Sequence, residues 1–135
     1  MFSHETKIRV RYGETDQMGY MYYGNYAEFY EVARVEMLRS LDMTYKAMED
    51  NGIIMPVLEM HCKYIKPALY DEEITIRTTL DKMPGVRIHF NYEFFNENKE
   101  LIHKGETTLA FVDMKRNRPC LPPERFREKL KAFFE

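Results

Sequence analysis

The segment from Arg11 to Tyr26 holds the residues of this sequence whose types and spacing best suit chemistry. Asp16 lies in a glycine-bounded loop just before a predicted helix. A carboxylate is ionised at neutral pH, so Asp16 could attack a carbonyl carbon directly or deprotonate a water molecule. An aspartate in such a loop also commonly serves as a turn or capping residue. The residues alone leave both roles open.

The start of the predicted helix adds a second chemical feature. The first backbone N–H groups of a helix have no partner within it, and they carry partial positive charge. Gly24 lets the backbone approach a ligand closely. Its N–H, with that of Tyr23 or Asn25, could therefore hold a carbonyl oxygen on which negative charge develops. Gly24 could equally serve the bend, with Asn25 as the N-cap and Glu28 as its capping-box partner.

The remaining histidines and cysteines offer no comparable site. Three of the four histidines fall within predicted strands, where we expect them to be ordinary strand residues: His61, His89 and His103. No histidine pair or carboxylate cluster has the spacing of metal ligands, so we expect no metal site. Cys62 and Cys120 are too far apart for a zinc motif, and we expect free thiols in a reducing cytoplasm.

Hydrophobic periodicity predicts the elements that position these residues. Alternation predicts strands over residues 7–12, 56–65, 73–80, 86–94 and 101–113. Helical spacing predicts a long helix over 25–40, a short one over 45–50, and a closing helix that starts at Pro122-Pro123. This order predicts one α+β domain over residues 1–135, in which four successive antiparallel strands are covered by the long helix. Exposed edge strands predict pairing with another copy of the chain, so at least a homodimer.

Charge and hydropathy exclude several classes of protein. The net charge is −2 and the pI is about 6.1, which gives no support to a nucleic-acid partner. No apolar run approaches the roughly 20 residues that a membrane-spanning helix needs. The N-terminal residues lack the pattern of a secretory signal. The sequence therefore predicts a soluble, cytoplasmic protein with no membrane span.

Several motifs, in the correct order, resemble the 4-hydroxybenzoyl-CoA thioesterase-like branch of the hotdog acyl-CoA thioesterases. The match covers nearly the whole chain. It rests on Thr15-Asp16 after the first strand, Gly19, the helix-opening run Tyr23-Gly24-Asn25-Tyr26, the helical residues Glu31, Ala33 and Arg34, and the stretch from Lys63 to Asp71. The resemblance implies a hotdog fold, with an antiparallel sheet wrapped around one long central helix and a short C-terminal helix.

The resemblance also implies hydrolysis of an acyl-CoA thioester to a free acid and coenzyme A. Asp16 would act as nucleophile or general base, and the helix start at Tyr23, Gly24 and Asn25 would polarise the thioester carbonyl. Coenzyme A is part of the substrate, so no cofactor is expected. The family often forms tetramers, which makes a homotetramer the expected assembly.

Four further residues are candidates for substrate binding on the same resemblance. Gly19 belongs to the motif, and Tyr22 could line an acyl slot or pack against the partner subunit. Glu59 lies near the place where some hotdog enzymes carry polar groups, although an outward strand glutamate is common. Lys66 and the basic cluster 115–118 could meet the phosphates of coenzyme A through charged hydrogen bonds.

One departure from the family pattern limits the mechanism. Many relatives of the bacterial cell-envelope-cluster type carry a histidine where this sequence has Tyr23, and tyrosine is a poor base at pH 7. A mechanism with a histidine base at that position is therefore not expected. Two alternative functions stay open: hydrolysis of acyl groups on acyl-carrier protein, and non-catalytic binding of acyl-CoA.

Overall fold

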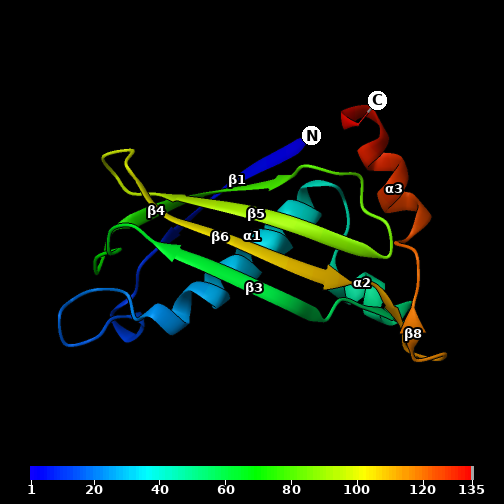
Figure 1. Cartoon of the computed structure of the whole chain (residues 1–135), viewed down its shortest axis with the longest axis horizontal. Coiled ribbons are helices and arrows are strands. Elements are labelled where there is room, and N and C mark those ends of the chain that lie inside the picture. Colours follow the sequence, from blue (N-terminus) through cyan, green and yellow to red (C-terminus); the bar gives the residue numbers. More distant parts are fainter. Residues whose placement is uncertain (135) are drawn as a thin grey trace.

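The computed structural model describes residues 1–134, and it shows one five-stranded antiparallel sheet with the long helix α1 (Tyr26–Ser40) packed across it (Figure 1). The strands of this sheet are β1 (Phe2–Arg9), β3 (Val57–Tyr64), β4 (Glu73–Leu80), β5 (Arg87–Phe95) and β6 (Leu101–Ala110). Two short helices complete the helical layer, α2 (Tyr45–Asp50) and α3 (Glu124–Leu130). The predicted α+β hotdog class is confirmed.

Minor elements flank the site and the far end of the sheet. Short 3₁₀ turns are η1 (Tyr12–Glu14), η2 (Tyr23–Asn25) and η3 (Lys131–Phe133). A second, three-stranded sheet joins β2 (Ile53–Ile54), β7 (Val112–Asp113) and β8 (Arg118–Pro119) in the order β2-β7-β8. The sequence did not predict this small sheet, because two-residue strands are too short to show alternation.

The strand order of the main sheet is β1-β4-β5-β6-β3. The four predicted strands β3, β4, β5 and β6 follow one another along the chain, but only β4, β5 and β6 form the expected meander of neighbouring strands. The chain crosses the sheet through α1 and α2 before β3 begins, and β3 therefore joins the edge beside β6. The edge strands are β1 and β3.

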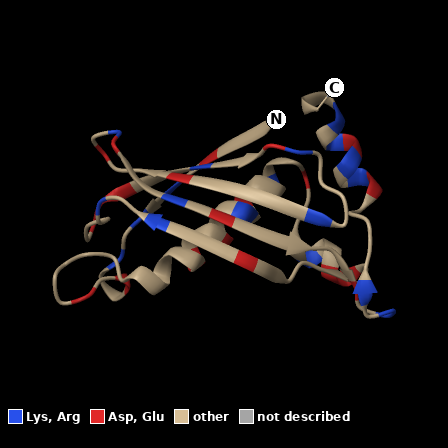
Figure 2. Ribbon diagram, in the orientation of Figure 1, with Lys and Arg blue, Asp and Glu red and all other residues tan. Residues whose placement is uncertain are grey.

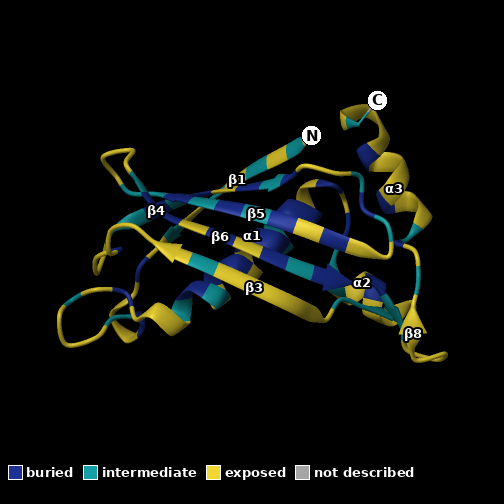
Figure 3. Ribbon diagram, viewed as in Figure 1, coloured by how far each residue is buried: buried dark blue, intermediate teal, exposed yellow. Residues whose placement is uncertain are grey.

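The core lies between the buried face of α1 and the inner face of the sheet (Figure 3). The helix contributes Tyr26, Phe29, Tyr30, Ala33 and Met37, and β5 contributes the predicted stripe Ile88, Phe90, Tyr92 and Phe94. Gly105 makes this packing possible at the centre of β6, since a Cβ atom there would lie 2.1 Å from the hydroxyl oxygen of Tyr30.

Two of the predicted strands had wrong bounds. The first strand was predicted over 7–12 and instead runs from Phe2 to Arg9; it ends at Arg9 because Tyr12 enters a 3₁₀ turn and is 78% exposed. The last predicted strand breaks at Phe111, whose buried ring packs against Phe126 of α3. Beyond that break the chain pairs with β2 instead of β3. The predicted helices 25–40 and 45–50 agree with α1 and α2.

Residues 1–134 contain two free thiols, and they contain neither a membrane-spanning helix nor a metal-binding group of side chains. No helix in this range is long and apolar enough to cross a membrane. Within the same range no group of three or more histidine, cysteine or acidic side chains could hold a metal ion. Cys62 and Cys120 are free thiols, as predicted.

Candidate active site

Residues 14–22 form a small hairpin between β1 and α1, and Asp16 lies at its turn. Thr15 and Met21 pair as an antiparallel bridge, and the N–H of Asp16 donates to the carbonyl of Tyr20 at 2.9 Å. The N–H of Gly19 donates back to the carbonyl of Asp16 at 3.1 Å. Gly19 has φ +78°, a conformation that favours glycine. Gly19 therefore shapes the turn that presents Asp16.

The carboxylate of Asp16 is exposed and only lightly held. Its Oδ1 accepts a hydrogen bond from the N–H of Met18 at 2.9 Å, which is the turn role that such an aspartate commonly has. Among residues 1–134, no other hydrogen bond or ion pair engages this carboxylate. Asp16 thus combines a fixed position with an oxygen that is open to a ligand.

Asn25 ties the hairpin to the start of α1. Its Nδ2 donates to the carbonyl of Glu14 at 2.8 Å, and the N–H of Tyr22 donates to the same carbonyl at 2.8 Å. The predicted capping box with Glu28 was wrong. Asn25 has φ −81° and ψ −11°, which is helical backbone, and its side chain makes no capping hydrogen bond. Asn25 therefore fixes Asp16 and Gly24 relative to each other.

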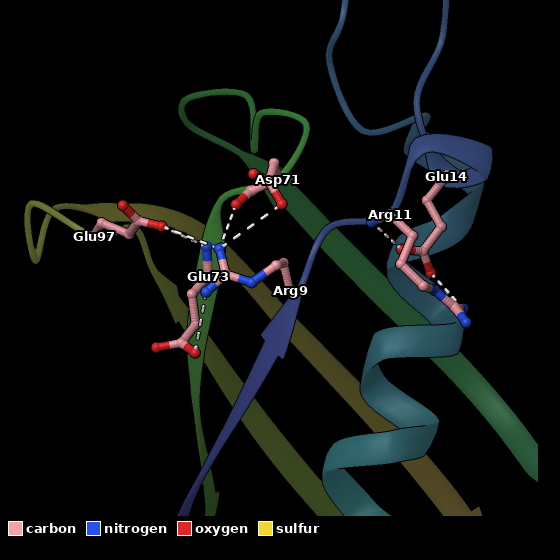
Figure 4. Close-up of polar contacts among 6 residues, drawn as sticks. All are labelled: Arg9, Arg11, Glu14, Asp71, Glu73 and Glu97. Carbon is pink, nitrogen blue, oxygen red and sulfur yellow. Dashed lines mark hydrogen bonds and ion pairs between the residues drawn. The ribbon is translucent and has the colours of Figure 1, made fainter.

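A buried carboxylate, which the sequence analysis missed, anchors the base of this hairpin. Glu14 is 6% exposed, and its Oε1 and Oε2 accept hydrogen bonds from the N–H and Nη2 of Arg11 at 2.8 and 3.0 Å (Figure 4). The hydrogen bond and charge of Glu14 raise the pKa of Arg11. The signal in the sequence was the opposite-charge pair three residues apart.

A second cluster holds the neighbouring loop in place. The guanidinium of Arg9, at the end of β1, lies 3.7 Å from the carboxylate of Glu73 and 3.8 Å from that of Glu97 (Figure 4). Asp71 lies 4.0 Å away. These groups are exposed, and such ion pairs contribute little stability. They nevertheless join three separate segments at the end of the sheet that carries the candidate site.

Gly24 lies in η2, which leads directly into α1. A Cβ atom at Gly24 would lie 2.7 Å from the ring of Tyr22, so glycine allows this ring to cover the turn. Within residues 1–134, no backbone carbonyl accepts a hydrogen bond from the N–H of Gly24. That N–H is one of the unpartnered donors at a helix start, where the helix dipole favours negative charge.

Exposed aromatic rings surround the helix start. Tyr23 is 66% exposed, and its ring lies 4.5 Å from that of Tyr22 between centroids. The hydroxyl of Tyr64, at the end of β3, donates to the carbonyl of Tyr23 at 3.1 Å. Desolvation and the Cys62 thiol raise the pKa of Tyr64 to about 12. Edge strand β3 is thereby attached to the candidate site through its last residue.

Glu59 and Lys66 are not gathered with Asp16 in the single chain. Glu59 is exposed in the middle of β3, roughly 16 Å along the strand from Tyr64. Lys66 forms an ion pair with Glu100 of the β5–β6 connection, and this pair lowers the pKa of Glu100. The other predicted site residues come together in one hairpin and helix start: Asp16, Gly19, Tyr22, Tyr23, Gly24 and Asn25.

His103 lies in the core and not at this site. Its Nε2 is hydrogen-bonded to the hydroxyl of Tyr30, and its Nδ1 is buried without a partner among the described side chains. Desolvation lowers the pKa of His103 to about 4. The imidazole is therefore neutral at pH 7 and enclosed by aromatic rings. Its prediction as a strand residue is confirmed.

A recess of about 340 Å³ lies between α1, α2 and the start of β3. Arg34 of α1 lines it and is only 6% exposed. Its Nε donates to the hydroxyl of Tyr45 and its Nη1 to that of Tyr92, both at 3.2 Å. Burial acts to lower the pKa of Arg34, but the two hydroxyls outweigh this effect and the pKa is raised. The sequence analysis noted Arg34 only as part of a family motif.

The hairpin, the helix start and the helix-on-sheet fold together define a class of protein. Residues 10–130 match the thioesterase-like superfamily, and the chain belongs to this family. YneP of Bacillus subtilis (strain 168), provisionally named an acyl-CoA thioesterase, is 33% identical over 88% of this chain and 86% of its own. The acyl-CoA thioester hydrolase YbgC of Escherichia coli O6:H1 is 31% identical over 87% of each chain.

A solved structure supports the same family. The crystal structure of DHNA-CoA thioesterase from Staphylococcus aureus is 36% identical, with a TM-score of 0.89, and the match covers 98% of this chain and 89% of that one. Together with the family match, this similarity confirms the resemblance read from the motifs.

Proposed function

We propose that this protein hydrolyses acyl-CoA thioesters, with Asp16 as its central catalytic residue. The observation that carries this proposal is the pairing of two groups by Asn25. An exposed carboxylate at Asp16 and the free N–H of Gly24 at a helix start are fixed relative to each other by one amide. A thioesterase needs both groups, one to attack or activate water and one to bind the developing oxyanion.

Two chemical routes fit this arrangement. In the first, an oxygen of Asp16 attacks the thioester carbon, the C–S bond breaks with departure of the coenzyme A thiolate, and water then hydrolyses the acyl anhydride. In the second, Asp16 takes a proton from a water molecule as that water attacks the same carbon, and the thiolate leaves. In both, the N–H of Gly24 donates to the carbonyl oxygen as its negative charge grows.

We propose that the protein works as a homodimer formed through β3. Edge strand β1 exposes Ser3, Glu5, Lys7 and Arg9 on its open face, which discourages pairing. Strand β3 and its end instead expose large apolar side chains at 43–49% of their surface, namely Val57, Leu58, Met60, Tyr64 and Ile65 (Figure 3). An exposed apolar edge strand is a template for a second strand.

The homotetramer stays a prediction. The open face of the main sheet, on the side away from α1, is the surface through which two dimers would pair. The open face of the sheet carries charges of both signs (Figure 2). Arg77 lies 3.5 Å from Glu5 and 3.6 Å from Glu93 on that face. A recess of about 790 Å³ there is lined by polar and charged residues that include Lys63 and Lys104. Such a mixed face could pair with its own copy.

The decisive experiment measures thiol release from short, medium, long and aromatic acyl-CoAs. We expect wild-type turnover, and a fall of at least about a hundredfold in Asp16→Asn and Asp16→Ala. Asp42→Asn is the matched control, because Asp42 is also an exposed aspartate but lies beyond the end of α1, away from the proposed site. Its carboxylate has one ion-pair partner, Lys129. Turnover that is indifferent to Asp16 would refute the assignment.

The same assay separates the two alternative functions. Faster turnover of the same acyl groups on acyl-carrier protein would favour the carrier-protein thioesterase. Saturable acyl-CoA binding without thiol release would identify a non-catalytic binding module. The exposed Asp16 carboxylate favours hydrolysis over the non-catalytic binding module, since a binder has no use for a nucleophile beside the helix start.

A further inference from the structure

Arg34 is a buried cation with no carboxylate partner. Within residues 1–134, its side chain has hydrogen bonds to two tyrosine hydroxyls and forms no ion pair. Burying an unpaired charge is costly, and buried guanidinium groups usually face carboxylates. The two tyrosines occupy Nε and Nη1, and the remaining N–H donors of the fork are suited to a further oxygen acceptor.

The recess beside Arg34 has the size and lining of a site for a small organic group. Its volume of about 340 Å³ falls at the lower end of the range for ligand pockets. Met48 of α2 supplies one apolar wall, and Ile53, Met55 and Val57 of the segment that follows α2 supply the others. A pocket with apolar walls and one cation fits a short carbon chain that ends in an anion.

Within one chain this recess is too far from the proposed catalytic groups. Arg34 follows Gly24 by ten positions, which corresponds to roughly 15 Å along the helix. The recess and the Asp16 hairpin lie near opposite ends of β3 (Figure 1). A short acyl group held at its own Gly24 could not reach its own Arg34.

The dimer proposed above removes this separation. Two β3 strands paired antiparallel about their centre, between Met60 and His61, would set Val57 of one chain opposite Tyr64 of its partner. Val57 lines the recess, and the hydroxyl of Tyr64 contacts the carbonyl of Tyr23 beside Gly24. The recess of each chain would then adjoin the catalytic hairpin of the other.

We propose that Arg34 of one subunit selects the acyl group bound at the partner's Asp16, and that the preferred substrate is a short acyl-CoA with a carboxylate at its far end. This inference rests on the proposed function. Arg34 would form a charged, bidentate hydrogen bond with that carboxylate. Tyr45 is a positioning residue, because its hydroxyl holds Nε of the guanidinium.

Two acidic residues line the same recess and act against an anion. Glu31 and Glu49 are exposed at its rim, where water and salt screen their charge. Arg34 is buried, so its interaction with a bound carboxylate is screened much less. The recess therefore favours an anion that reaches past the rim to the guanidinium.

The substrate test compares acyl-CoAs of equal carbon number, glutaryl-CoA with pentanoyl-CoA and adipoyl-CoA with hexanoyl-CoA. In one of these pairs we expect the wild type to prefer the carboxylated acyl group by at least about tenfold in kcat/KM. Arg34→Met should abolish this preference, through a fall of at least about tenfold in kcat/KM for the carboxylated acyl-CoA. Tyr45→Phe should weaken the preference through a higher KM. Arg39→Met, at an exposed arginine of the same helix, should retain it.

A mixed dimer tests whether Arg34 acts across the interface. Asp16→Asn and Arg34→Met chains are co-expressed with different tags, and the mixed dimer is purified through both tags. In one of its two sites, the Arg34→Met chain supplies an intact Asp16 and the Asp16→Asn chain supplies an intact Arg34. That dimer should recover about half of the wild-type activity on the carboxylated substrate, since one of its two sites is intact. If Arg34 served its own chain, both sites would be defective and the activity on the carboxylated substrate would stay at or below that of the Arg34→Met homodimer.

A binding measurement guards against a folding defect in the Arg34 variant. Calorimetry on the Asp16→Asn enzyme, with and without Arg34→Lys, should show tighter binding of the carboxylated acyl-CoA only when Arg34 is present. Turnover of the uncharged acyl-CoAs with no carboxylate preference would overturn this inference alone. No turnover of any acyl-CoA would overturn the proposed function, and the inference with it.

Discussion

The amide of Asn25 sets the geometry of the proposed site by joining the hairpin to the start of α1. It binds the carbonyl of Glu14, whose own carboxylate is buried against Arg11. The base of the hairpin is therefore held by two side chains: Asn25 at the start of the helix, and Glu14 in the first turn of the hairpin. Asp16 contributes only a turn contact to Met18, so its position depends on these neighbours.

Replacement of Asn25 by alanine should lower activity more than stability. The variant loses one hydrogen bond, worth about 1 kcal/mol of unfolding free energy. Because the hairpin then moves relative to Gly24, kcat should fall by at least about tenfold. Asn51→Ala removes the same kind of bond, from Nδ2 to the carbonyl of Ala47 at 2.8 Å, at the end of α2. Equal losses of kcat in the two variants would contradict this role.

Among the secondary-structure elements, the contact between α1 and β6 decides how closely helix and sheet approach. Tyr30 of α1 lies over Gly105 of β6, stacks on Tyr92 with a centroid distance of 4.4 Å and hydrogen-bonds to buried His103. Gly105 faces Cys62 of β3 and Tyr92 of β5 in the sheet register. A glycine at the centre of a strand marks such a close approach.

Gly105→Ala should therefore destabilise the fold strongly. The added Cβ atom would overlap the ring and hydroxyl of Tyr30, and an overpacked core typically loses about 1–3 kcal/mol. Gly85→Ala is the control, since a Cβ atom there meets nothing within 4 Å. Denaturant unfolding of both variants measures the difference. A Gly105→Ala protein as stable as the control would show that α1 can shift away from β6 at little cost.

Sequence patterns predicted the elements well where periodicity was long, as in α1 and in the stripe of β5. They failed where tertiary contacts decide, as at Phe111, whose burial against Phe126 ends a strand that alternation would continue. The Asp16 hairpin and the Gly24 helix start came from family motifs. The role of Arg34 could not be predicted, because only the fold places the hydroxyl of Tyr92 beside it. The pairing of Glu14 with Arg11 is local and had a signal in the sequence, but the burial of its carboxylate depends on the fold.

The whole molecule has two unequal sheet edges, and this asymmetry directs its assembly. Edge strand β3 is exposed along nearly its whole length, and it is attached to the helix start through Tyr64 and Tyr23 (Figure 3). Val32 of α1 is 42% exposed. Pairing through β3 would cover the apolar strand and bring a second chain to the site. Catalysis and assembly are then linked in the proposed function.

This link predicts that breaking the interface should also abolish activity. Met60 is 48% exposed near the centre of β3, and Met60→Lys would set two lysines close together across the two-fold axis. Like charges opposite each other destabilise strand pairing. Light scattering should show a shift from dimer to monomer, with a parallel loss of thiol release. Leu121→Lys, at an apolar residue that is 56% exposed outside the main sheet, should leave both unchanged. A fully active Met60→Lys monomer would separate catalysis from assembly and restrict the site to a single chain.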